Sequence, residues 1–424
     1  MERRTFLVRG GQTLACALGG HASELGLRTE QRQSQDSSNT LEERVATVIQ
    51  AYDAQGNHRT GTEVDRESAK WLADEVRRLG VESSLESFAL SRVDPHSCYL
   101  RVGNRRIDGV PLFDAGFTDD QGVRGKLGLL GSDAPIALLE IGPLQLADPR
   151  AEHQGSIAKA RHSQHKGVVL LTRGRRPGLF LSNALAFKNP FGPPILQVSS
   201  AESDWLRQQV QALAEAMLVV QASRTPAQAF NVTAEVSGSN PSLSPIIFMA
   251  PRSAWWQCVS EQGCRMACWL EIIRALVAGK PARNRSFVAL SGHELGVLGM
   301  DAYMERRPDL VWRALAWIFL GSSIGAPRQP NLIHASDEVL EQWMVAAIKK
   351  EGIPVDQTAP HNSPARGEAS VIQQGGGRFV TVACDSDTYH SVADRWPDAV
   401  DVAALARYAK AFADGALQLA RQGA

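Results

Sequence analysis

The segment Phe287–Tyr303 reads FVALSGHELGVLGMDAY and is the most informative part of the chain. An apolar run ends at Ser291-Gly292, the pair His293-Glu294 follows, and a helix start with spaced glycines comes next. The pattern predicts a buried strand over residues 286–291 that leads into a helix from about Leu295. The polar pair therefore lies at the junction between strand and helix.

Strands and helices alternate through the rest of the C-terminal half. The expected elements are the strands 246–250, 315–320 and 378–384 and the helices 263–278 and 402–420. This alternation predicts an α/β fold, a three-layer sandwich with a mostly parallel central sheet. Between about residues 113 and 225, short strands separated by Gly/Pro turns predict an inserted β-rich unit.

A chain of 424 residues is long enough for two structural units. We expect residues 41–112 and 226–424 to form one discontinuous α/β domain, with residues 113–225 as the insert. Residues 1–40 are expected to be an export signal and a polar linker. Met1-Glu-Arg-Arg-Thr-Phe-Leu7 looks like a twin-arginine signal, which predicts a periplasmic or extracellular protein. The alternatives are a cytoplasmic protein, if residues 1–20 are not a signal, and a lipidated Cys16.

The composition excludes several classes of partner. Lys and Arg together number 45, as do Asp and Glu, and no long basic block occurs, so nucleic acid is not an expected partner. No run of about 18 apolar residues occurs, so no transmembrane segment is expected. The close spacing of Cys258, Cys264 and Cys268 lacks the second pair of a zinc knuckle, although a Cys258–Cys264 disulfide remains open in an exported protein.

Several segments resemble the two-zinc aminopeptidases, the family of aminopeptidases S and Y, glutamate carboxypeptidase and glutaminyl cyclase. Phe287–Tyr303 is similar to the family segment "FvafsGEELGLlGS", and Ala229–Gly238 resembles "yNViaeipG", which returns the chain into the peptidase sheet. Ser156–Leu170 looks like the helix–glycine–strand element of a protease-associated domain. The resemblance therefore implies a peptidase fold with a protease-associated insert.

The resemblance also implies where the catalytic residues lie. The general base of the family is matched by His293, and the bridging carboxylate, counted without gaps, by Glu261. The remaining zinc ligands are matched by Pro251, Glu294, Ser322 and His390. Proline has no lone pair to give, and serine is a weak neutral ligand, so two ligand positions are lost.

Two functions follow from this resemblance. The first is an exported, catalytically inactive relative without a cofactor that binds a peptide or protein in the former active-site cleft. The second is a mono-zinc peptidase or glutaminyl-cyclase-like enzyme that holds at most one zinc on Glu261, Glu294 and His390, with His293 as general base. The general base of the family is an acid, so the second function requires a histidine in its place.

Two further expectations concern neighbouring residues. Gly321-Ser-Ser-Ile-Gly325 fits the G-x-S-x-G pattern, and the order Ser323, Asp385, His390 would suit a serine hydrolase. Pro327 opposes the helix that such a nucleophile requires. Trp255 and Trp256 follow the lost ligand, and we expect at least one indole to pack toward Glu294 and His390 and fill the emptied pocket.

Overall fold

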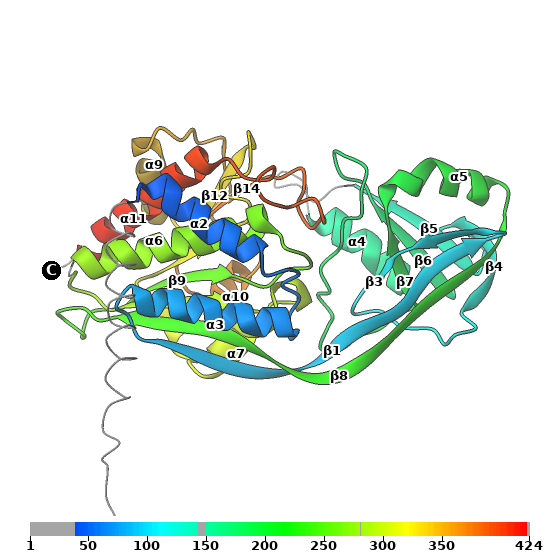
Figure 1. Ribbon diagram of the computed structural model, residues 1–424, viewed down its shortest axis with the longest axis horizontal. Coiled ribbons are helices and arrows are strands. Elements are labelled where there is room, and N and C mark those ends of the chain that lie inside the picture. The colour runs from blue at the N-terminus through cyan, green and yellow to red at the C-terminus, as the bar shows by residue number, and fades with distance from the viewer. Residues whose placement is uncertain (1–38, 143–149, 280, 422–424) are drawn as a thin grey trace, which may run out of the picture.

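The computed structural model describes residues 39–142, 150–279 and 281–421. Nearly all of the expected signal and linker, including Cys16, lies outside these residues. Figure 1 shows a larger α/β lobe and a smaller β-rich lobe. Two long antiparallel strands, β1 (Ser83–Val102) and β8 (Glu215–Val236), run from one lobe into the other and connect them.

The sheet of the α/β lobe has parallel strands at its centre and antiparallel strands on either side. Its order is β13 (Gln357–Thr358), β12 (Asn331–Ala335), β14 (Phe379–Cys384), β11 (Ala316–Leu320), β9 (Ile246–Pro251), β10 (Arg285–Leu290) and β8. Strands β14, β11, β9 and β10 pair in parallel, whereas β12 is antiparallel to β14 and β8 to β10. The α/β class is confirmed. The sheet as a whole is mixed, so the expectation of a mostly parallel sheet is not.

Both faces of this sheet are buried, which explains why its central strands are continuous apolar runs. Along β9, Phe248 packs into one core and Met249 into the core on the opposite face. The first core is covered by α2 (Leu41–Asp53), α3 (Glu63–Arg78), α6 (Cys264–Gly279), α9 (Glu338–Lys350) and α11 (Val402–Arg421). The second core is covered by α7 (Leu298–Glu305), α8 (Leu310–Arg313) and α10 (Ala369–Gln374).

The β-rich lobe has two apolar cores of its own. Its strands are β2 (Arg105–Asp108), β3 (Val110–Pro111), β4 (Val123–Leu129), β5 (Ile136–Ile141), β6 (Gly167–Thr172) and β7 (Ile195–Val198). Its helices are α4 (Arg150–Arg161) and α5 (Ser203–Gln211). Strand β4 pairs with β8, so a single hydrogen-bonded sheet continues from one lobe into the other.

The predicted helix after β10 begins later than expected. A single 3₁₀ turn, His293–Leu295, comes first, and α7 begins at Leu298. The delay has a backbone cause, because Gly292, Gly296 and Val297 all have positive φ angles of 84°, 76° and 60°. A left-handed residue cannot continue a right-handed helix, so the polar pair is held in a turn instead.

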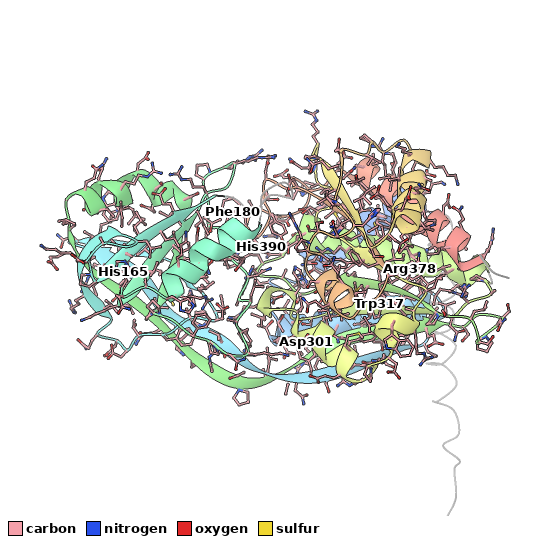
Figure 2. All side chains as sticks on the ribbon, turned by 180° about the vertical axis from the view of Figure 1, so that it is seen from behind. His165, Phe180, Asp301, Trp317, Arg378 and His390 are labelled. Atoms are coloured by element: carbon pink, nitrogen blue, oxygen red, sulfur yellow. The ribbon has the colours of Figure 1, made fainter. Side chains whose placement is uncertain are left out.

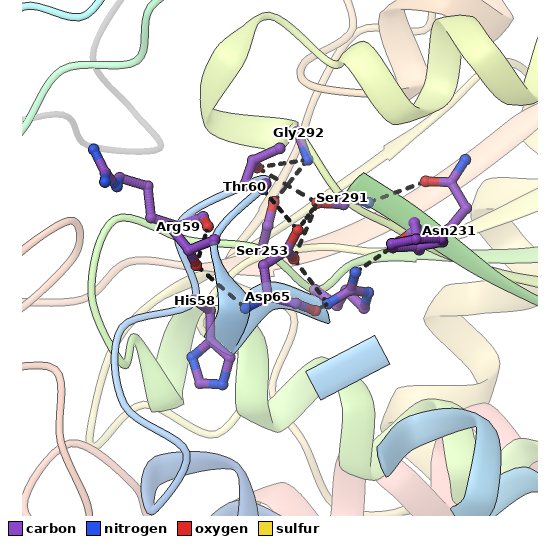
Figure 3. A network of polar contacts seen from close by, with 12 residues as sticks. His58, Arg59, Thr60, Asp65, Asn231, Ser253, Ser291 and Gly292 are labelled. Carbon is purple, nitrogen blue, oxygen red and sulfur yellow. Dashed lines mark hydrogen bonds and ion pairs between the residues drawn. The ribbon is translucent and has the colours of Figure 1, made fainter. Parts of the chain in front are cut away.

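A buried ion pair fastens α3 to the end of β9. Figure 3 shows its acid, Asp65, in a polar network with Ser291. Arg252 and Asp65 are fully buried, and Arg252 Nη1 lies 2.9 Å from Asp65 Oδ1. The Asp65 carboxylate also accepts hydrogen bonds from the Ser291 hydroxyl at 3.1 and 3.0 Å and from the Gly61 amide at 2.9 Å. Because Ser291 ends the β10 segment, this carboxylate joins α3, β9 and β10 next to the His293-Glu294 turn.

The variant Asp65→Asn should therefore lower the free energy of unfolding by about 3 kcal/mol, since it leaves the charge of Arg252 buried and unpaired. Chemical denaturation followed by circular dichroism measures the loss. The matched control is Asp74→Asn on the same helix, where the carboxylate is 55% exposed and pairs with Arg77. That change should cost no more than about 0.5 kcal/mol. Similar losses in the two variants would contradict the central place of this ion pair.

Candidate functional site

The sequence-predicted site residues gather where the central parallel strands end. Ser253 follows β9, the turn of His293 and Glu294 follows β10, Ser322 follows β11 and His390 follows β14. Parallel strands present their carboxyl ends at the same edge of a sheet, the usual place for a ligand site in α/β folds. The topology therefore brings these positions to one edge.

Glu294 is buried and both of its carboxylate oxygens are already bonded within the protein. Oε1 accepts hydrogen bonds from the amide and the hydroxyl of Thr60, at 3.0 and 2.6 Å, and Oε2 accepts one from the Ser253 hydroxyl at 2.7 Å. The Gly292 amide in turn donates to the Thr60 and Ser253 hydroxyls. Burial raises the pKa of Glu294, although these donors lower it in part. The residue acts here as an acceptor that holds the turn.

Pro251 and Ser322, the two substituted ligand positions, have backbone roles. Pro251 is the last residue of β9 and is paired with Leu290 in β10. The carbonyl of Ser322 accepts a hydrogen bond from the Cys384 amide at 2.8 Å, which joins the loop after β11 to β14. Neither residue offers a strong metal donor.

His293, at the general-base position, is buried and bound to a second acid, Glu368. Its Nδ1 lies 3.0 Å from both carboxylate oxygens of Glu368, while its Nε2 has no hydrogen-bond partner among the described residues. Burial raises the pKa of Glu368, but the neighbouring His293 and then Arg265 outweigh burial and lower it. Glu368 is the residue immediately before α10. It belongs to no recognisable motif, so it was not predicted from the sequence.

His390 and Glu261 form a second buried histidine–carboxylate pair. The Nε2 of His390 lies 3.4 Å from Glu261 Oε1, and its Nδ1 lies 2.6 Å from the carbonyl oxygen of Leu181. Burial raises the pKa of Glu261, but His390 and the charges of His293 and Arg265 outweigh burial and lower it to about 2. Glu261 is therefore an ionised carboxylate, and its Oε2 has no hydrogen-bond partner among the described residues.

Asp394 and Cys258 lie behind Glu261. Asp394 accepts hydrogen bonds from the amides of Ser260 and Glu261, at 2.8 and 3.1 Å. Burial and the nearby charge of Glu261 raise the pKa of Asp394 to about 7. Burial also raises the pKa of Cys258, which keeps its thiol protonated. Within the described residues, Cys258, Glu261 and Asp394 are the set of three whose donor atoms all lie within 4.8 Å of one another.

Arg265 is a buried cation in the middle of these acids. It is 2% exposed, and its Nε and Nη1 have no hydrogen-bond partner in the described parts of the chain. Its guanidinium lies over the ring of Phe319, 5.7 Å from the centroid. Burial lowers the pKa of Arg265, and the charges of Glu261 and Glu368 raise it in part. Sequence reasoning missed this residue, although Arg265 stands at the second glycine of the family segment "GAnDnaSG".

A cleft of about 580 Å³ opens above this cluster. Arg265, His293 and Ser322 line it on one side, together with apolar residues such as Val297 and Phe319. This volume lies in the range of small-ligand and peptide sites. The cleft therefore gives a ligand access to the Arg265 end of the cluster.

Comparison with known proteins relates this arrangement to a fold. No family model matches the sequence, and no curated protein matches it significantly. Solved structures do match over nearly the whole chain. The peptidase M28 precursor of Shewanella amazonensis has a TM-score of 0.74 and 17% identity, covering 95% of this chain and 98% of that one. The zinc aminopeptidase of Bacillus subtilis has a TM-score of 0.72 and 16% identity, covering 90% and 96%. The chain has the fold of the zinc aminopeptidases.

The donor set of this aminopeptidase fold does not fit two zinc ions. Pro251 and Ser322 supply no strong donor, and both oxygens of Glu294 are bonded to Thr60 and Ser253. Of the sequence-predicted ligands, Glu261 Oε2 and His390 Nε2 have no hydrogen-bond partner among the described residues, and the buried guanidinium of Arg265 interacts electrostatically with the same acid. A second zinc ligand set is therefore not assembled by these residues.

A loop from the β-rich lobe lies against the site of the aminopeptidase fold. The amide of Leu181 donates to the His390 carbonyl, and that of Ala184 donates to the Glu294 carbonyl. Figure 2 shows Phe180 and His390 where the two lobes meet. Trp255 is 3% exposed, donates to Asn183 at 3.2 Å and packs in one apolar cluster with Leu181. The indole therefore supports this loop and does not line the cleft, while Trp256 is half-buried beside it.

The other sequence-based alternatives receive no support from the geometry. Ser323 is fully buried, its hydroxyl has no hydrogen-bond partner among the described residues, and its segment forms turns and not a helix. His390 is paired with Leu181 and Glu261, so it does not serve Ser323. The five described cysteines are free and buried, so the Cys258–Cys264 disulfide is absent from this structure. No described helix has the length and apolar character needed to cross a membrane.

The elevated pKa of Asp394 predicts a pH-dependent stability. An acid whose pKa rises from about 4 in the unfolded chain to about 7 in the folded one stabilises the fold fully only below about pH 4. This contribution is lost as the pH rises through about 7. The free energy of unfolding of the wild type should therefore fall, by an amount on the order of a few kcal/mol, between pH 5 and 8.

The variant Asp394→Asn, which cannot titrate, should show a clearly smaller decrease over this range. Chemical denaturation at pH 5, 6.5 and 8 measures both proteins. Every other titratable group is present in both proteins, so the difference between the two slopes isolates Asp394. Equal slopes would show that Asp394 does not titrate in this window.

Proposed function

We propose that this protein is a catalytically inactive relative of the zinc aminopeptidases that binds a peptide or protein segment in the former active-site cleft. The single observation that carries the proposal is the buried guanidinium of Arg265 among Glu261 and Glu368. Buried carboxylates require a compensating charge. In a zinc peptidase that charge comes from the metals, and here the buried cation close to both acids is Arg265.

The loss of catalysis follows from the same residues. Zinc peptidases activate water on the metal, which lowers the pKa of the water and polarises the substrate carbonyl. The donors for two metals are not assembled here, and the residue at the general-base position, His293, already contacts Glu368 through Nδ1. Among the described residues that line the cleft, we assign none to replace the metal as the activator of water.

The mono-zinc alternative has one observation in its favour. Glu261 Oε2 and His390 Nε2 are buried and have no hydrogen-bond partner within the part of the chain that the structure describes, and both residues belong to the expected one-zinc set. The third member, Glu294, is bonded through both oxygens to Thr60 and Ser253. Two protein donors beside a fixed positive charge make a weak zinc site, so we favour the inactive protein.

We further propose the domain organisation and location that the sequence indicates. Residues 41–112 and 226–424 would form the aminopeptidase-like domain, and residues 113–225 the protease-associated insert. The β-rich lobe with its own two cores supports this division. Export through the twin-arginine-like segment at Met1–Leu7 would place the cleft outside the cytoplasm, where peptides are its available partners.

Purified protein should not hydrolyse aminoacyl p-nitroanilides, either as isolated or after addition of two equivalents of zinc. The readout is the release of nitroaniline over several hours at pH 7 to 8. The matched controls are His390→Ala and Glu261→Gln, because a contaminating peptidase would give the same background in all three proteins. Turnover by the wild type that disappears in both variants would contradict the proposal and favour the mono-zinc enzyme.

A further inference from the structure

The charges around the cleft indicate which end of a peptide it accepts. Among the described residues that line the cleft, none is an aspartate or a glutamate, whereas Arg265, Arg366, His293 and His334 all line it. The acids of the site do not line this surface, and two of them are in contact with a histidine. Glu368 lies 3.0 Å from His293, and Glu261 lies 3.4 Å from His390.

Arg265 is a cation on this surface whose hydrogen-bonding capacity is partly unused. Arg265 lines the cleft and is only 2% exposed. Two of its nitrogens have no hydrogen-bond partner in the described residues. His293 also lines the cleft, is 5% exposed, and has an unpartnered Nε2. Two unsatisfied polar side chains at one wall of a cleft are an incomplete site, because buried donors are almost always bonded.

We propose that this cleft binds a carboxylate with an apolar neighbour, most simply the C-terminal residue of a peptide, with the carboxylate at Arg265 and His293. The inference rests on the proposed peptide-binding function and specifies its polarity. A guanidinium binds a carboxylate through two parallel charge-assisted hydrogen bonds. The apolar side chain of the last residue packs against Phe319, Val297 and Leu332, which line the same cleft.

The opposite polarity does not suit these residues. A peptide amino terminus is a cation, and a cleft lined by arginine and histidine without an acid leaves that cation uncompensated. An aminopeptidase acts at the amino end of its substrate, so the charge of this cleft favours the reverse orientation. The replacement of a small residue by Arg265 thus changes which end of the ligand the pocket recognises.

The direct test compares ligands on the wild-type protein by isothermal titration calorimetry. The ligands are a tetrapeptide ending in leucine as the free acid, the same peptide as its C-terminal amide, and the N-acetylated acid. The two acids should bind alike, and the amide about tenfold to a hundredfold more weakly, as expected for the loss of charged hydrogen bonds. Equal binding of acid and amide, or a tenfold loss on N-acetylation, would overturn the inference.

A fourth ligand, N-acetyl-leucine, distinguishes the source of the carboxylate. Binding comparable to that of the tetrapeptide supports a small free acid as the natural ligand, and much weaker binding supports a peptide C-terminus. Peptides that bind without any preference for the acid leave the proposed function intact and reject only the polarity. If none of the four ligands binds, both proposals fail.

Variants on α6 provide the second measurement. Arg265→Met should abolish the preference for the acid over the amide, whereas Arg265→Lys should retain part of it. The matched control is Arg274→Met on the same helix, which removes a partly exposed arginine that contacts Glu271 and should leave binding unchanged. A folded Arg265→Met protein that keeps the full preference would overturn the inference. If that variant does not fold, the comparison of acid and amide on the wild type still decides.

Discussion

The proposed site depends on one electrostatic interaction, the attraction between the buried guanidinium of Arg265 and the buried carboxylates of Glu261 and Glu368. Glu261 and Glu368 are both essentially inaccessible to solvent, and ionised carboxylates in such surroundings are costly unless a cation lies close by. An aminopeptidase meets this requirement with zinc. In this chain the cation is a side chain on α6, covalently fixed at the position that the family keeps as glycine. Each of these acids also has a histidine beside it: His293 lies beside Glu368, and His390 lies beside Glu261.

The other substitutions at the site agree with this change. In the proposed metal-free protein the carboxylate of Glu294 acts as the acceptor that closes the turn after β10, and Ser253 supplies one of the donors. Pro251 can then end β9, where a ligating side chain is no longer required. The ion pair of Asp65 and Arg252 holds the same strand ends from the α3 side. Glu294 and Pro251, two of the positions matched to zinc ligands, therefore have structural roles in this polar cluster.

Much of the fold could be predicted from the sequence because its signals are local. The apolar run before Ser291 and the helical period of 402–420 each depend on neighbouring residues, and both appear in the structure as β10 and α11. The antiparallel direction of β8 was harder to predict from the sequence, because it depends on how the chain returns from the β-rich lobe. The start of α7 was missed because the positive φ angles of Gly292, Gly296 and Val297 cannot be inferred from hydrophobic spacing.

The site was predictable only in part for the same reason. His293, Glu294 and His390 lie in recognisable motifs, but Glu368 reaches His293 from a loop that has no motif of its own. Arg265 was visible as a change from glycine, yet its role depends on distances to acids that are far away in the sequence. The most direct test of the account is the metal content of the purified protein by elemental analysis. The account predicts well under one zinc per chain even after incubation with zinc and removal of the excess, and a stable content of two zinc ions per chain would contradict it.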